Sequence, residues 1–274
     1  MFATTKGTLS TWSASKGDHM GILRSILSCI VLLSTFVTAS AQWLNYRTPG
    51  MPRTPDGKPN LSAPAPKTSD GKPDLSGLWQ ASQGKYLNDL AADGAPAPAQ
   101  PWAEAFFKKI QASDGKGRPQ ERCLPHGVTD YDALPMPIKF VQTPGEIVIL
   151  YEAYNHFRQV FLDGRPLPKD DPQPTWMGYS VGKWDGDTLV VDSGGFNDQT
   201  WLDDGGHPHT EALHITERFH RRDFGHMDLQ LIVDDPKAYT KPWGAKLTLN
   251  FLPDDELLEN ICENEKDFAH IVGK

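Results

Sequence analysis

The sequence predicts a mainly β fold, an antiparallel β-barrel or sandwich with an N-terminal disordered arm and one or two short helices. Two features predict it. From residue 138 onward, apolar and polar residues alternate in short runs, the pattern of strands that bury one face. Asp-Gly, Pro-Gly and Gly-Gly pairs separate these runs, and such pairs favour tight turns between antiparallel neighbours. Short strands joined by turns are typical of closed barrels and of sandwiches.

The N-terminal part of the chain has the features of a secretory signal peptide. Arg24 precedes an apolar run over residues 26–37, and the small residues 39–41 form an A-x-A cleavage site. The run is too short to favour a membrane-spanning helix. We therefore expect a signal peptide over residues 20–41, and we interpret the polar residues 1–19 as an extension upstream of the true start. The mature protein is expected to be periplasmic or secreted, without stable membrane insertion.

Residues 42–73 are rich in Pro, Gly and small polar residues and lead to a single β-rich domain, residues 74–274. They contain a short repeat, with Asp-Gly-Lys-Pro-Asn-Leu-Ser at 56–62 and Asp-Gly-Lys-Pro-Asp-Leu-Ser at 70–76. Asp-Gly and X-Pro pairs favour turns or extended backbone, which indicates a mobile arm rather than a folded unit. Trp79 is where a large apolar side chain can first anchor the arm to a core.

A short helix is expected over residues 101–112. Pro101 suits the first helical turn, and apolar residues recur on one face at helical spacing. Residues 254–272 also have a helix-like composition.

Two cysteines remain after removal of the signal peptide, Cys123 and Cys262. In an oxidising compartment, two cysteines favour one disulfide, here joining an early loop to the C-terminal segment. The alternative is two separate buried thiols.

The predicted strands lie between turn signals along the second half of the chain. They span residues 138–143, 146–151, 157–162, 177–184, 188–192, 210–221, 225–233 and 245–251. The connection over residues 166–174 holds four prolines and is expected to be a loop.

Strand register decides which side chains reach the interior. A three-residue connection over residues 222–224 pairs His220 with His226 and matches the apolar faces of the two strands. Glu217 then projects from the apolar face, where a carboxylate must be paired or have a raised pKa. Such a group suits general acid or base catalysis. The alternatives are a buried salt bridge, for example to Arg158, or a strand end that reaches water.

A second candidate is the histidine-rich segment that precedes this strand. In an extended segment, side chains two residues apart share a side, so His207, His209 and Glu211 could converge on a metal ion. Imidazole and carboxylate groups suit a divalent metal such as zinc. The alternative is a loop whose histidines form hydrogen bonds or face water. His214 joins Glu217 as a candidate catalytic residue.

Aromatic residues form a third candidate. Trp201, Trp176, Tyr179 and Tyr151 could line a cavity for a ring-shaped ligand. Core packing is the alternative, because barrel strands are commonly built from aromatic residues.

Three runs of the sequence resemble a widespread group of secreted bacterial proteins. They are Asp-Gly-Lys-Pro-Asp-Leu-Ser-Gly-Leu-Trp at 70–79, Gly-Asp-Thr-Leu-Val-Val-Asp at 186–192 and Gly-Gly-His-Pro-His-Thr-Glu at 205–211. The resemblance covers nearly the whole mature chain and implies secretion, but it assigns no catalytic role. The order of the strands resembles that of lipocalin-type barrels, as an analogy of fold alone.

The charge balance and the missing motifs argue against several classes of function. The chain has 27 basic and 35 acidic side chains, a net charge of −8, which argues against nucleic acid as a partner. Nucleotide-binding loops and the serine-hydrolase motif are absent from the sequence. The leading hypothesis is a barrel that binds an apolar or aromatic small molecule near residues 207–217. The alternatives are a metal- or His/Glu-dependent hydrolase, lyase or isomerase using the same residues, and a module that docks proteins through the Pro-rich arm.

Overall fold

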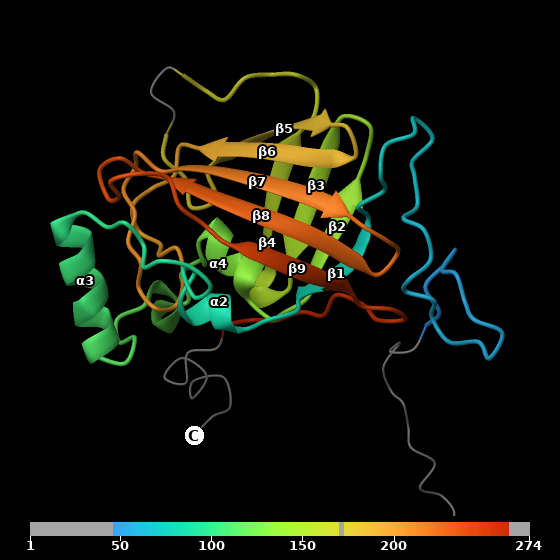
Figure 1. Cartoon of the computed structure of the whole chain (residues 1–274), viewed down its shortest axis with the longest axis horizontal. Coiled ribbons are helices and arrows are strands. Elements are labelled where there is room, and N and C mark those ends of the chain that lie inside the picture. Colours follow the sequence, from blue (N-terminus) through green and yellow to red (C-terminus); the bar gives the residue numbers. More distant parts are fainter. Residues whose placement is uncertain (1–45, 170–172, 263–274) are drawn as a thin grey trace, which may run out of the picture. The chain divides into compact units, whose positions relative to one another are not determined.

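A computed structural model describes residues 46–169 and 173–262, and the predicted signal peptide lies outside this part. Nine strands form a closed barrel in which each strand pairs with the next along the chain and β9 pairs with β1 (Figure 1). All eight predicted strands are present, and the segment at Trp79 adds β1. The strands are β1 Gly77–Ala81, β2 Ile138–Gln142, β3 Glu146–Tyr151, β4 His156–Phe161, β5 Tyr179–Asp185, β6 Thr188–Gly194, β7 His214–Arg221, β8 His226–Asp234 and β9 Lys246–Phe251.

One neighbouring pair in the barrel is parallel. β4 and β5 run in the same direction, with Val160 opposite Ser180, whereas every other pair is antiparallel. Strand direction cannot alternate all the way round a ring with an odd number of members. Nine strands therefore require one parallel contact, and the long proline-rich connection after β4 provides the crossover that it needs.

The predicted helix over residues 101–112 is confirmed as α3, Pro101–Ala112, with Pro101 in its first turn. It lies outside the barrel (Figure 1). Two further α-helices, α2 Lys85–Asn88 and α4 Val128–Ala133, have no counterpart in the prediction. Two short 3-10 turns, Pro119–Arg122 and Ala153–Asn155, complete the helical segments of the described residues. No helix in these residues is both long and apolar enough to cross a membrane.

The β7–β8 register differs from the predicted one by two residues. His220 pairs with Asp228 rather than with His226, because the connecting turn is longer than the three residues expected. A shift of two preserves the face of every side chain, since strand side chains alternate with period two. Glu217 therefore lies on the inward face, as the apolar matching predicted.

The N-terminal boundary of β7 is also later than predicted. The segment from Thr210 to Leu213 forms a turn, with the Leu213 N–H donating to the Thr210 carbonyl at 3.1 Å. The histidine-rich segment before it is therefore irregular backbone, not an extended strand.

Helix α4 contributes its whole length to the core. All six of its residues are buried. The ring of Tyr131 stacks on that of Tyr151 in β3, with centroids 4.3 Å apart. The barrel strands add aromatic and aliphatic side chains such as Phe140, Phe219 and Ile149. Side chains thus pack the barrel interior at this end.

The described part of the Pro/Gly-rich arm has local turn structure that its composition did not predict. Each copy of the repeat forms the same turn, with the Thr54 N–H donating to Lys58 and the Thr68 N–H donating to Lys72. In each copy the threonine hydroxyl also donates to the aspartate two residues later. The arm is held to the β7–β8 turn by the Gly225 N–H, which donates to the Leu61 carbonyl at 2.8 Å.

The predicted disulfide between Cys123 and Cys262 is confirmed. The segment from Asp254 to Cys262 is irregular rather than helical, and the rest of the predicted helix lies outside the described residues. Side chains at the end of β3 explain this outcome. Glu152 accepts a hydrogen bond from the Leu258 N–H, and Asn155 accepts one from the Asn260 N–H, so these donors are not available to a helix.

Candidate functional site

The barrel interior contains a buried polar network centred on Arg158 in β4. Its guanidinium donates to both carboxylate oxygens of Glu217, with Nη1 2.9 Å from Oε1. It also donates to the hydroxyls of Ser180 at 2.8 Å and Ser193 at 2.7 Å. Arg158 and Glu217 are 2% and 0% exposed. The predicted alternative, a buried salt bridge between these two residues, is confirmed.

Asp132 of α4 and Tyr151 of β3 lie beside this ion pair. Burial and the nearby Glu217 carboxylate raise the pKa of Asp132 well above its usual range, and burial raises the pKa of the Tyr151 phenol. Every member of the network is screened from solvent. A substrate could not reach Glu217 without opening the barrel, so we interpret this network as structural.

The other catalytic candidate does not share this environment. His214 and Glu217 both lie in β7, but they are three residues apart and their side chains project from opposite faces. The structure therefore does not bring them together.

The three candidate metal ligands are also separated. The His207 ring hydrogen-bonds to Asp203 at 2.6 Å, whereas the His209 ring hydrogen-bonds to the Thr200 hydroxyl at 2.7 Å. Glu211 is exposed in the turn before β7. The three side chains are not among the groups of the described residues whose ligand atoms lie close enough together to hold a metal ion. The expected convergence required an extended strand, and this segment is a loop.

The four aromatic candidates occupy different surroundings. Tyr151 is buried in the barrel beside Tyr131, whereas Trp201 packs edge-on against Phe106 of α3 with centroids 5.9 Å apart. Trp176 and Tyr179 are half-buried near the start of β5, and the Tyr179 hydroxyl donates to the Gln173 carbonyl at 3.1 Å. Tyr151 and Trp201 thus contact rings from different helices, α4 and α3.

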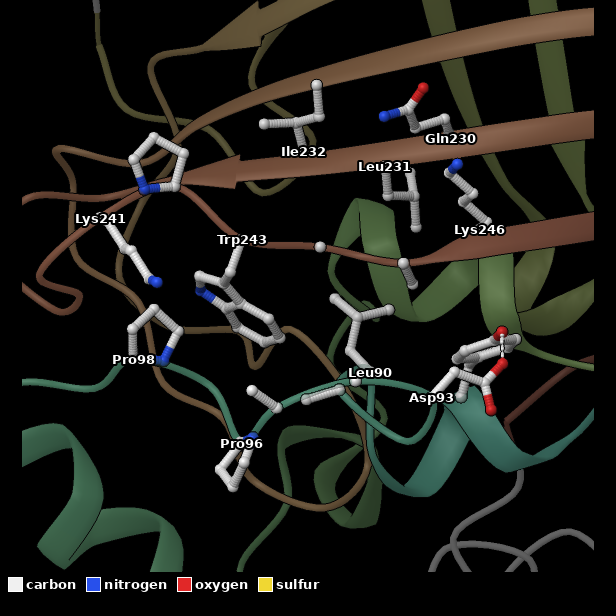
Figure 2. A pocket seen from close by; sticks show the side chains of 17 residues that line it. Leu90, Asp93, Pro96, Pro98, Gln230, Leu231, Ile232, Lys241, Trp243 and Lys246 are labelled. Atoms are coloured by element: carbon white, nitrogen blue, oxygen red, sulfur yellow. Dashed lines mark hydrogen bonds between the residues drawn. The ribbon is translucent and has the colours of Figure 1, made fainter.

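A pocket of about 730 Å³ lies on the outer side of the barrel near β8 and β9, and we call it the Trp243 pocket (Figure 2). One wall is formed by outward-facing residues of these strands, including Ile232 and Lys246. The opposite wall is the Pro/Ala-rich segment 90–98. Figure 2 shows the Trp243 indole between the two walls.

Hydrogen bonds hold the segment 90–98 at both ends. The Leu90 N–H donates to the Asp203 carboxylate at 2.7 Å. At the other end, the carbonyl of Pro98 accepts hydrogen bonds from the Thr240 N–H at 2.8 Å and from its hydroxyl. The segment therefore arches over the strands from two fixed points, which leaves space beneath it.

Trp243 is positioned by both its backbone and its ring. Its N–H and carbonyl pair with Val233, which extends the β8–β9 contact. Its ring packs against Tyr239 and His207, with centroids 5.0 and 5.2 Å away. His207 in turn stacks on Phe107 of α3. His207 thus supports the pocket from behind.

The pocket contains a few polar groups among mainly apolar walls. The Trp243 indole N–H is buried and has no hydrogen-bond partner within the described residues. Lys241 and Lys246 lie at the rim. Asp93 is occupied by Lys85 and by the Tyr86 hydroxyl, and burial raises the pKa of Tyr86 to about 12, so that Tyr86 remains a donor.

The sequence does not predict this pocket. None of the expectations drawn from the sequence concerns residues 91–100 or Trp243. The two walls are about 140 residues apart in the sequence, and no local pattern indicates that they meet. The one available signal was the isolated Lys-Pro-Trp at 241–243, where a large aromatic side chain stands outside any strand.

Neither the models of known protein families nor the curated protein sequences that were compared with this chain match it.

Proposed function

We propose that this chain is an extracytoplasmic β-barrel protein that binds a small apolar or aromatic molecule in the Trp243 pocket. The observation that carries this proposal is a cavity with mainly apolar walls whose lining includes Lys241, Lys246 and Trp243, and the buried indole N–H of Trp243 has no partner within the described residues. Ligand sites typically combine apolar walls with a few polar groups that orient the ligand. The ligand site is thus proposed on the flank of the barrel, next to His207, rather than in its mouth.

The polar groups of the pocket indicate what the ligand carries. A buried N–H without an acceptor costs roughly 1–3 kcal/mol, and a ligand oxygen would remove this cost. Lys241 and Lys246 at the rim favour an anionic oxygen over a neutral one. We therefore infer an apolar or aromatic molecule with a carboxylate or a similar acidic group.

Two features support export of the protein. The Cys123–Cys262 disulfide is typical of oxidising compartments, and residues 20–41 have the composition of a signal peptide. A binding role outside the cytoplasm is consistent with both.

Isothermal titration calorimetry of the mature protein with 2-naphthoate and with uncharged naphthalene-2-carboxamide tests the proposal. We expect 1:1 binding of 2-naphthoate and weaker binding of the amide. Ala95→Trp places a bulky side chain in the pocket from an exposed position and should abolish binding. Ala92→Trp makes the same change at an exposed position outside the lining and is the matched control.

The role of the lysines is tested separately. Lys241→Ala should weaken binding of the carboxylate more than that of the amide, whereas Lys237→Ala, an exposed change outside the pocket lining, should not. Equal binding by the Ala95→Trp and Ala92→Trp proteins would contradict the assignment of the pocket.

A further inference from the structure

A second group of side chains lies away from the Trp243 pocket and has no role in the proposed ligand binding. His126, Asp130 and Asp204 each offer a ligand atom, and these three atoms lie within 4.8 Å of one another. His126 and Asp204 line a pocket of about 460 Å³, which we call the His126 pocket.

The fold brings these residues together from two segments. His126 precedes α4 and Asp130 lies one turn further on, so that the imidazole Nδ1 is 2.6 Å from an Asp130 oxygen. Asp204 comes from the loop after β6, which packs directly on the start of α4. The Thr129 hydroxyl donates to the Leu202 carbonyl at 2.6 Å, and Gly127 leaves no room for a side chain against this loop.

Three buried oxygen atoms in this group lack a partner within the described residues. They are Asp130 Oδ1, Asp204 Oδ1 and Gln120 Oε1. Asp130 is 0% and Gln120 8% exposed, and the Gln120 amide N–H donates to Asp130 at 3.0 Å. All three atoms are acceptors, so the group that would satisfy them is a cation or a set of donors. Native proteins rarely leave several buried acceptors unpaired at one place.

The local charge also favours a bound cation. Asp130 and Asp204 bring two carboxylates together, and the nearby cationic side chain is Arg118, whose Nη1 is 3.2 Å from Asp204. Asp203, the residue before Asp204 in the same loop, adds a third carboxylate near Asp130. Partly buried carboxylates in excess over cations are stabilised by a bound cation.

A second aspartate–histidine group provides a comparison. Asp89, Asp203 and His207 also lie close together. In that group, however, Asp203 accepts hydrogen bonds from the N–H groups of Leu90, Gly206 and His207 and from the His207 ring. Asp203 has its acceptor capacity filled, so this group is a structural support of the pocket wall.

We propose that His126, Asp130 and Asp204 bind one divalent metal ion of the zinc or manganese class, with the side-chain amide of Gln120 beside it. One imidazole nitrogen with two carboxylate oxygens is a donor set that suits these ions. The opening of the His126 pocket gives solvent access to the group. The ion would displace the proton shared by His126 and Asp130, because metal ligands bind in their deprotonated forms.

The test is calorimetric titration of the chelator-treated, untagged mature protein with Zn²⁺ and with Mn²⁺, combined with elemental analysis of the protein as purified. We expect one site per chain, and a loss of affinity of at least ~10-fold in Asp204→Asn. This variant keeps the side-chain shape at a partly exposed position, so it should remain folded; Asp130→Asn is the second variant, with folding checked by circular dichroism. His226→Ala disrupts a partly exposed histidine–aspartate pair away from this group, with Asp223 2.7 Å away, and is the matched control that should bind normally.

Three results would overturn the proposal. The first is no binding of either ion at micromolar concentration, and the second is equal affinity in Asp204→Asn and the wild type. The third is loss of the ion in Asp89→Asn with retention in Asp204→Asn, which would move the site to the His207 group. The first two results leave the proposal for 2-naphthoate unchanged, because that ligand depends on a different pocket, whereas the third would place the ion in the group that supports the Trp243 pocket wall.

Discussion

Arg158 and Glu217 lie where solvent does not reach them, so each depends on the other to compensate its buried charge. Glu217→Gln would leave the guanidinium without its counter-charge. We expect this change to lower the free energy of unfolding by about 3–5 kcal/mol, measured by urea denaturation. Asp185→Asn is the matched control. It removes the carboxylate that pairs with Arg218, a partly exposed neighbour of Glu217 in β7, and should lower the free energy of unfolding by less than ~1 kcal/mol.

The same experiment separates a structural from a catalytic role for Glu217. A catalytic carboxylate could be replaced by an amide with little effect on stability. If Glu217→Gln unfolds at the same urea concentration as the wild type, the structural interpretation is wrong.

His209 gives the protein a pH-dependent contribution to stability. Its ring is buried, accepts a hydrogen bond from the Thr200 hydroxyl and donates weakly to the Thr210 carbonyl, an arrangement that suits the neutral form. Burial lowers the pKa of His209 below its usual 6.5. The unfolded chain then binds the proton more tightly, so this contribution is full above pH 6.5 and is lost as the pH falls below that value.

His209→Gln should therefore flatten the fall in unfolding free energy between pH 7 and about pH 5. The measurement is a series of urea denaturation curves across this range. His220→Gln removes an exposed histidine of β7 and should keep the wild-type slope. An unchanged slope in His209→Gln would show that the buried neutral imidazole does not contribute.

Local sequence patterns predicted the long helix α3 and the barrel strands from β2 to β9. The α3 bounds follow from Pro101 and from the apolar spacing, and the strands follow from alternation. Helix α4 escaped prediction because its six residues have no helical period and depend on burial in the barrel end. The β7–β8 register was two residues off because the length of a turn is not fixed by the faces it joins.

The disulfide joins elements that are 139 residues apart in the sequence. A cross-link over a loop of this length restricts the unfolded chain and is worth up to about 5 kcal/mol in the chain-entropy account. We expect the Cys123→Ser/Cys262→Ser protein to melt roughly 10 °C lower than the wild type in differential scanning calorimetry. Wild type treated with a reductant should match the double variant, and an unchanged melting temperature in either sample would contradict this expectation.

For the molecule as a whole, the barrel is a packed scaffold and its two candidate sites lie outside it. The Trp243 pocket is formed against β8 and β9 by the segment 90–98, and the His126 pocket is formed where α4 meets the loop at Asp204. The fold class and the inward position of Glu217 could be read from the sequence. The pockets could not, because each one joins segments that are far apart in the chain and that no alternation or motif links.

The indole N–H of Trp243 offers the most direct test of the central claim, the binding of an apolar acidic molecule in this pocket. Its signal can be assigned in a ¹⁵N–¹H correlation spectrum by its loss in Trp243→Phe, a change that keeps an aromatic ring and removes no hydrogen bond within the described residues. On titration with 2-naphthoate, the signal should move downfield and saturate as the N–H gains an acceptor, and it should remain unmoved in Ala95→Trp. A Trp243 signal that does not respond to 2-naphthoate, or that responds equally in Ala95→Trp, would contradict the account.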